Sequence, residues 1–293
     1  MKIDRRTAIK TAAVGVGSLA ITPEFLRAAD GKKLFGEGFA NLETLTTGEW
    51  WKRPGNNGKP APRGRKGAPP SMNVPRDQVV AFAMYTHQGG VLKLSAQFFP
   101  LKPGEKREAR LELMLPGQKK WSVAARTEVH YPGWDAHFRI EDWDNTNDVK
   151  YRVCHGEKAK FEGLIRRDPV DRDEIVVANL SCNSSRTTGP RDEIVRNLRR
   201  LNPDLLFFGG DQHYRHTEHT TGWIEFGLQY RDVIRDRPTV CIPDDHDVGH
   251  GNVWGESGKR STIRGDADGG YRYPVKYVNQ VQRQQTTSLP DPV

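Results

Sequence analysis

The strongest constraint in this sequence is a pair of short apolar runs that each end in a cluster of acidic and imidazole side chains. The run at 204–208 leads into GGDQHY at 209–214, and the run at 239–242 leads into PDDHD at 243–247. Each run is too short for a helix and is typical of a buried strand, while the apolar residues at 222–236 follow helical spacing. The sequence therefore predicts a strand, a helix and a second strand parallel to the first.

A third strand of the same kind is expected upstream, at 173–180. It runs into Cys182 and Asn183, and a helix is expected after it at 190–201. In open α/β sheets, ligands sit beyond the carboxyl ends of the strands. Three strand ends are thus expected to meet at one polar site, in an α/β domain that covers residues 173–293.

The start of the helix at 190–201 also has a chemical implication. Pro190 follows Thr188 and Gly189, and proline is favoured in the first turn of a helix. The unpaired backbone N–H groups of such a turn attract anions. We therefore expect an anion to be favoured at this end of the sheet.

Residues 77–168 have the pattern of a different domain. Seven short runs rich in β-forming residues alternate with turn signals such as Gly-Gly and Pro-Gly. The runs lie at 79–85, 91–99, 109–115, 121–129, 136–141, 149–154 and 159–164. This spacing predicts an all-β sandwich of the immunoglobulin or fibronectin type. A charged, proline-containing connector at 168–173 follows it.

The N-terminus has the pattern of an export signal. Arg5 and Arg6 precede a weakly apolar run at 11–22, which is too short to span a bilayer stably. The paired arginines indicate the twin-arginine route for residues 1–30, with the export machinery as a partner and a periplasmic or cell-surface location. A cytoplasmic amphipathic helix is the alternative. No other segment approaches ~20 apolar residues, so we expect no transmembrane helix in the mature chain.

Residues 31–76 form an irregular segment that contains a basic loop rich in proline and glycine. The chain as a whole carries 45 basic and 37 acidic residues, a formal net charge of +8. The basic loop lacks the interleaved aromatic residues that stack on bases, so we expect no binding specific for nucleic acids.

The side chains at the three strand ends are those of a metal site. Oxygen ligands such as Asp211, Asp244 and Asp245 suit calcium, magnesium or manganese, whereas the thiolate of Cys182 and the phenolate of Tyr214 suit iron. Adjacent charged groups after a buried strand are costly unless cations compensate them. Two different metals are therefore compatible with this set.

Other cysteines and histidines have more than one interpretation. Cys182 and Cys241 are either a ligand and a buried thiol or, after export, a disulfide. His213, His216 and His219 recur every three residues, which fits a zinc site or an ordinary loop. Of the three, we expect His213 to touch substrate or metal.

Three of these blocks together resemble a known family. Ser-Cys-Asn at 181–183, Gly-Asp-Gln-His-Tyr at 210–214 and Asp-Asp-His-Asp at 244–247 are similar to successive blocks of the PhoD-like alkaline phosphatases, a branch of the calcineurin-like metallophosphoesterases. The resemblance covers 173–293. It implies a metallophosphoesterase α/β sandwich, iron and calcium as metals with other divalent cations compatible, and hydrolysis of phosphate mono- or diesters.

The resemblance also assigns roles to residues. The implied metal ligands are Cys182, Asp211, Tyr214 and Asp245. The implied catalytic residue is His246, as phosphate contact or general acid. The residues expected to bind substrate or to support the ligands are Asn183, His213, Asp244 and Asp247.

The chain departs from the family at its end. The family closes its site with aspartate and histidine residues from later strands, and no histidine follows His250 here. We therefore expect the front part of a longer α/β domain, with weak or no activity in this chain. Two functions follow: an exported metal-dependent phosphohydrolase acting on a small or polymeric phosphoester, or a non-catalytic protein that binds a surface, a glycan or phosphate through a remnant metal site.

The export signal gives the first testable prediction. A reporter fused to residues 1–30 is expected to be exported, and replacing Arg5 and Arg6 by lysine is expected to block its export because the arginine pair is the recognised element. The measurement is the share of reporter outside the cytoplasm. Unchanged export of the double variant would favour the cytoplasmic helix.

Overall fold

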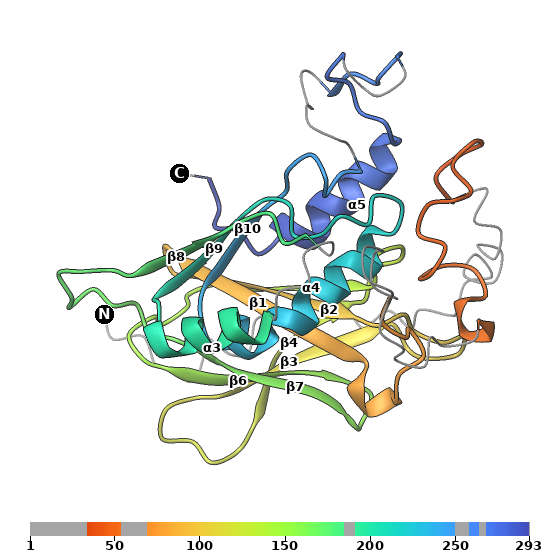
Figure 1. Ribbon diagram of the computed structural model, residues 1–293. Coiled ribbons are helices and arrows are strands. Elements are labelled where there is room, and N and C mark those ends of the chain that lie inside the picture. The colour runs from red at the N-terminus through yellow and green to blue at the C-terminus, as the bar shows by residue number, and fades with distance from the viewer. Residues whose placement is uncertain (1–33, 54–68, 185–190, 250–257, 264–267, 293) are drawn as a thin grey trace.

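The computed structural model describes residues 34–53, 69–184, 191–249, 258–263 and 268–292. Seven antiparallel strands form two facing sheets (Figure 1). The strands are β1 (Val80–Gln88), β2 (Val91–Phe98), β3 (Glu108–Met114), β4 (Ser122–Glu128), β5 (Asp135–Ile140), β6 (Val149–His155) and β7 (Ala159–Ile165). All seven strands expected from the sequence are therefore present.

The strand order is β1-β2-β5 in sheet A and β4-β3-β6-β7 in sheet B. The rings of Tyr85 on β1 and Tyr151 on β6 meet edge to face, with centroids 6.2 Å apart, so the two sheets share a buried interior. This arrangement is a two-layer β-sandwich. Its assignment to the immunoglobulin or fibronectin type stays a prediction.

Three parallel strands form sheet C, in the order β10-β9-β8. They are β8 (Val177–Leu180), β9 (Leu205–Gly209) and β10 (Thr239–Ile242). The helices are α3 (Arg191–Leu201), between β8 and β9, α4 (His219–Ile234), between β9 and β10, and α5 (Val275–Thr286). The predicted unit of a strand, a helix and a parallel strand is confirmed. Short 3₁₀ helices lie at Trp50–Lys52 and Arg76–Gln78.

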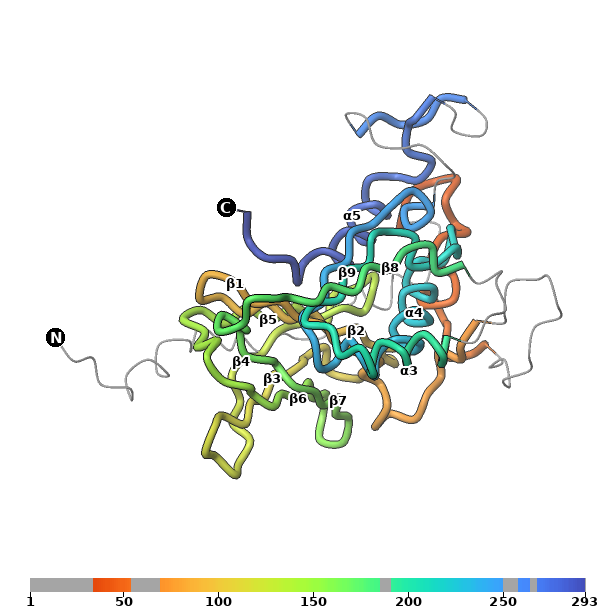
Figure 2. Tube along the Cα trace, turned by 60° about the vertical axis from the view of Figure 1, so that its left-hand side comes forward, coloured from red at the N-terminus to blue at the C-terminus, as the bar shows by residue number. Residues whose placement is uncertain are grey.

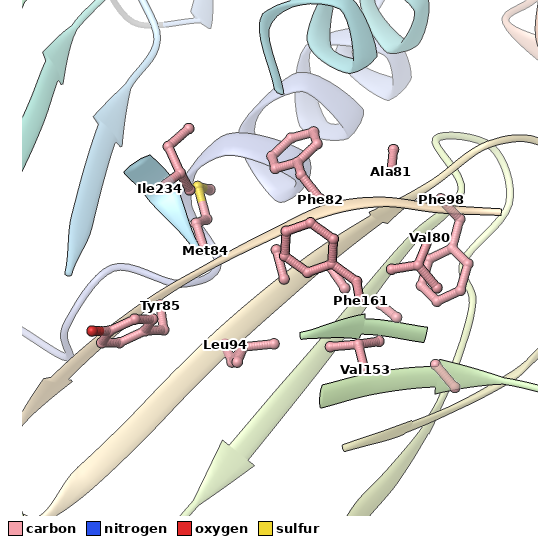
Figure 3. Close-up of a cluster of buried hydrophobic side chains, with 14 of the residues drawn as sticks. Val80, Ala81, Phe82, Met84, Tyr85, Leu94, Phe98, Val153, Phe161 and Ile234 are labelled. Atoms are coloured by element: carbon pink, nitrogen blue, oxygen red, sulfur yellow. The ribbon is translucent and has the colours of Figure 1, made fainter. Parts of the chain in front are cut away.

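Strand β1 is buried on both faces, because the sandwich and the α/β unit both pack on it. Phe82 and Met84 point toward α4 and Ile234, whereas Tyr85 points toward sheet B (Figure 3). A register irregularity between Val80 and Phe82 changes the facing of side chains along this strand. A strand covered on both sides is apolar throughout, which explains the continuous run of buried residues.

Helix α4 lies unusually close to β1, and a glycine makes the approach possible. A Cβ atom added at Gly227 would lie 1.9 Å from the ring of Phe82. Phe82 also meets Trp223 edge to face, with ring centroids 5.4 Å apart. The sandwich and the α/β unit thus have one continuous core. The domain boundaries drawn from the sequence stay a prediction.

Several expectations fall outside the described residues. They are the export signal at 1–30, most of the basic loop, at 54–68, and the helix start at Thr188, Gly189 and Pro190. Within the described part, no helix combines the length and the apolarity needed to cross a bilayer.

The contact between α4 and β1 gives a prediction on stability. Gly227→Ala is expected to lower the free energy of unfolding by about 2 kcal/mol, because the new methyl group overlaps a ring that is itself fully buried. In an exposed helix the same change would be stabilising. Arg231→Ala, on the exposed side of α4, is the control and is expected to change stability by less than about 0.5 kcal/mol. Urea unfolding measures both; equal stability of Gly227→Ala and wild type would contradict the packing.

Candidate metal centre

The loops after β8 and β9 take an uncommon backbone conformation at the residues that carry the chemistry. Cys182 has φ 55° and Asp211 has φ 58°, both in the left-handed region that side chains rarely adopt. Residues held in this way cost of order 1–3 kcal/mol each and cluster at functional sites. Backbone hydrogen bonds join the loops, from Cys182 N–H to Gly210 O and from Asn183 N–H to Asp211 O.

Gly210 lets the loop after β9 approach the loop after β10. Its φ is 93°, and an added Cβ atom would lie 2.4 Å from Cβ of Asp244. Any other residue here would push the two strand ends apart. The Gly-Gly-Asp sequence therefore serves the close approach of the acidic groups.

The buried carboxylate of Asp247 joins the loop after β9 to the loop after β10 through hydrogen bonds. Asp247 is fully buried, and its carboxylate accepts backbone N–H groups of Asp211 at 2.8 Å, Gln212 at 3.0 Å and Asp244 at 3.0 Å. Burial raises the pKa of Asp247 to about 7, against the opposing effect of these hydrogen bonds. Its place is thus behind the site, where it supports the ligands.

Asp211, Asp245 and His246 form the middle of the site. Each offers a ligand atom, and these atoms lie within 4.8 Å of one another. Tyr214 Oη donates to Asp211 Oδ2 at 2.7 Å, and the Cys182 thiol lies 3.8 Å from the same oxygen. The structure therefore brings together the four implied metal ligands and the implied catalytic histidine, from all three strand ends.

The burial and hydrogen bonding of the Asp211 carboxylate indicate whether these residues can hold a metal ion. The Asp211 side chain is 6% exposed, and among the described residues its buried Oδ1 atom has no hydrogen-bond partner. Burial, together with the carboxylates of Asp245 and Asp244, raises its pKa, while Tyr214 and His246 lower it. A buried carboxylate oxygen without a donor is costly, and a cation removes that cost. The donor set of carboxylates, imidazole, thiol and phenol fits metal ions.

His246 is oriented by a residue to which sequence reasoning gave no role. His216 Nε2 and His246 Nδ1 are 2.7 Å apart, and their rings stack with centroids 4.9 Å apart. The ring of Tyr214 lies 4.2 Å from that of His246. Because His246 Nδ1 is engaged in this hydrogen bond, Nε2 is the ring nitrogen left to contact a metal ion or a substrate. The three-residue histidine spacing was a signal for His216, but it did not distinguish His216 from its neighbours.

The structure places His213 in the interior, and His213 is not among the residues whose ligand atoms lie within 4.8 Å of one another. Its Nδ1 accepts the backbone N–H of Arg215 at 3.2 Å, and its Nε2 is 2.8 Å from Nδ1 of His219. An added Cβ atom at Gly222 would lie 2.4 Å from the His213 ring. Burial lowers the pKa of His219 to about 3, so that ring stays neutral. The geometry gives the pair a packing role and does not form a zinc site from the three histidines.

The remaining predicted residues connect the strand ends. Asn183 donates to Gln212 O at 3.1 Å and to Gln229 Oε1 at 2.8 Å, and it accepts from Arg191 Nε at 2.6 Å. Its amide groups are therefore engaged with the protein. Asp244 is exposed, and its Oδ1 accepts the N–H of Asp245 at 2.8 Å. Asp244 is thus the carboxylate that faces solvent.

The cysteines are all free. Cys182 is exposed, whereas Cys241 is buried with its sulfur 4.0 Å from Met84 Sδ. Burial raises the pKa of the Cys241 thiol well above its usual value. Cys182 therefore has the exposure that a ligand needs, and Cys241 packs as a small apolar residue.

Residues 34–53, which we call the N-terminal strap, form hydrogen bonds with the end of the loop that carries Tyr214 and His216. Figure 2 shows the strap beside α4 and α5. Glu43 N–H donates to Thr217 O at 2.8 Å, and the Glu218 carboxylate accepts the N–H groups of Thr44 and Leu45 at 3.0 and 2.9 Å. The strap therefore belongs to the support of the site.

Comparisons with known proteins are limited to the fold. No family model matches the chain, and no curated protein matches it. The solved structure of PhoD aligns with a TM-score of 0.56 and 11% sequence identity, over 75% of this chain and 48% of that chain. A purple acid phosphatase isolated from yellow lupin (Lupinus luteus) seeds aligns with a TM-score of 0.47 and 14% identity, over 72% of this chain and 40% of that one.

The likeness to PhoD shows that part of that fold is shared by this chain. This chain spans about half the length of that solved structure, at 48%. The partial α/β fold expected from the sequence is thus supported as a fold.

The strap generates a pH prediction. Burial, and then the nearby Glu43 carboxylate, raise the pKa of Glu218 from 4.5 to about 7. Because the folded-state pKa is raised, its stabilising contribution is complete below about pH 4.5 and is lost as the pH rises through about 7. With a chelator present, the free energy of unfolding is expected to fall between pH 5 and pH 8, by up to about 3 kcal/mol from this group.

Glu218→Gln is expected to remove the part of this pH dependence that Glu218 contributes, because the variant does not titrate there; the part from Asp247, whose pKa burial also raises to about 7, remains. Glu193→Gln, at an exposed position of α3, is the matched control and should keep the wild-type slope. Urea unfolding at the two pH values measures the difference. An unchanged slope in Glu218→Gln would refute the assignment.

Proposed function

We propose that this protein is a metal-dependent phosphohydrolase that acts on phosphate mono- or diesters. One observation carries the proposal: Asp211 is buried with one oxygen on Tyr214 and the other unpartnered, beside Asp245 and His246 at the ends of parallel strands. Such a group meets the needs of metal-assisted hydrolysis. The fold shared with PhoD supports it.

The residues divide into two donor groups that share Asp211. Cys182 and Tyr214 lie on the Oδ2 side of Asp211 and suit iron, while Asp245 and the carboxylates around it suit calcium or another divalent cation. When bound, such metal ions supply positive charge to the phosphate oxygens and lower the pKa of water.

The chain's own residues supply orientation and a proton. His246 Nε2, with Nδ1 fixed by His216, is placed to give a proton to the departing ester oxygen. The strained backbone at Cys182 and Asp211 and the buried Asp247 hold the donors in place before substrate arrives. The proposal extends to an exported enzyme, on the sequence of residues 1–30.

Asp211→Asn tests the assignment directly. The variant is expected to lose metal and at least 100-fold of the hydrolysis of p-nitrophenyl phosphate and its diester, because it loses the carboxylate that both groups share. His246→Ala is expected to lower kcat more than metal content, since its role is proton transfer. The measurements are metal content by mass spectrometry and steady-state rates.

Asp192→Asn, at an exposed position of α3, is the control and should resemble wild type in both measurements. Hydrolysis that persists in Asp211→Asn would place the chemistry elsewhere. A wild-type protein that takes up no iron, calcium or other divalent cation would contradict the proposal as a whole.

A further inference from the structure

A polar cavity lies at the end of sheet C opposite to the metal ligands, where its parallel strands begin. It has a volume of about 530 Å³, and residues of β6, β7, α3 and α4 line it. Arg237 precedes β10 and Asn202 precedes β9, whereas Asp211 and Asp245 follow these strands. Strands of this length separate the two places by roughly 15 Å.

Basic side chains dominate the lining of this cavity. They are Lys150, Arg166, Arg199, Arg235 and Arg237. The acidic ones are Glu162, Asp232 and Asp236. Five positive charges against three negative ones leave an excess of two. Glu162 and Asp232 are exposed. Asp236 accepts the N–H of Leu164 at 3.1 Å and forms an ion pair with Arg235 at 3.7 Å, so neither Asp236 nor Arg235 is free of partners.

Arg237 is a buried cation in the lining of this cavity. Its side chain is 5% exposed and donates to Val233 O at 3.3 Å and to Asn202 Oδ1 at 2.9 Å. Within the described ranges its Nε has no hydrogen-bond partner and no carboxylate pairs with it. Burial, and then the cations Arg166 and Arg199, lower its pKa, against the opposing effect of the nearby Asp236 carboxylate. A buried guanidinium is normally paired, because an unpaired one is costly.

A neutral amide holds a second guanidinium against the first. Asn202 Oδ1 accepts from Arg166 Nη2 at 2.7 Å as well as from Arg237. The two nitrogens are thus no further apart than two hydrogen bonds allow. Asn202 has φ 48° and its N–H bonds to Leu198 O at the end of α3, which fixes the amide in place. Two like charges are thereby gathered without a carboxylate between them.

From this convergence we propose that the cavity binds the oxyanion of a phosphate group. Guanidinium groups recognise phosphate through paired N–H donors, and an anion relieves the repulsion among Arg166, Arg199 and Arg237. The volume lies in the range of small-molecule sites and exceeds what a bare phosphate ion fills. Inorganic phosphate and a small phosphorylated metabolite share this chemistry. The inference does not depend on the metal site.

Calorimetric titration of the full chain, in the presence of a chelator, tests the proposal. Inorganic phosphate and glycerol 3-phosphate are the two probes, and saturable binding of at least one is expected. Tighter binding of glycerol 3-phosphate by tenfold or more would identify an organic phosphate as the occupant, and equal binding would identify inorganic phosphate. Arg199→Gln is expected to weaken binding about tenfold, and Arg237→Gln to abolish it.

Two control variants show whether the phosphate binds in this cavity. Arg196→Gln lies on α3 outside the cavity lining and should bind as wild type does. Asp211→Asn should also bind phosphate unchanged, which distinguishes the cavity from the metal centre. The proposal is overturned if neither probe saturates, if Arg196→Gln loses as much affinity as Arg199→Gln, or if Asp211→Asn abolishes binding. Should Arg237→Gln fail to fold, the comparison of Arg199 with Arg196 still decides.

Discussion

The site depends on one buried carboxylate, that of Asp247. Its oxygens take backbone N–H groups from the loops after β9 and β10, and those loops carry the ligands. Without this acceptor, three backbone N–H groups would be left without a hydrogen-bond partner. Each such group would lower the stability of the fold by about 1–3 kcal/mol. The left-handed backbone of Asp211 is tolerated because its N–H has this fixed partner. The metal group is therefore held by main-chain hydrogen bonds before any side chain meets an ion.

The sequence was sufficient for the local elements and for the direction of sheet C. Alternating and continuous apolar runs, bounded by glycine and proline, predicted all seven strands of the sandwich and the three of the α/β unit. Strand ends carrying Cys182, Asp211 and Asp245 predicted the place where ligands would meet, because parallel strands share an edge.

What the sequence could not supply was contact between distant segments. The spacing of His213, His216 and His219 is regular, yet only the loop geometry decides that His216 reaches His246 while His213 turns to His219. Nothing local in residues 34–53 marks them as a support for Thr217 and Glu218. The joint core of sandwich and α/β unit rests on Gly227 against Phe82, a match visible only in three dimensions.

The strap has a consequence for the order in which this protein can be assembled. Thr44 and Glu218, which hydrogen-bond to each other, are 174 residues apart in the sequence. Phe35 packs on Tyr277 of α5, with ring centroids 5.6 Å apart. The strap therefore cannot complete its contacts until α5, near the end of the described residues, is in place. Contacts of such long range form late and slowly, since a large loop must close before they are gained. The strap is thus synthesised early on the ribosome but packs onto the protein late in folding. The loop with Tyr214 and His216 has all of its stabilising contacts only after the strap has packed.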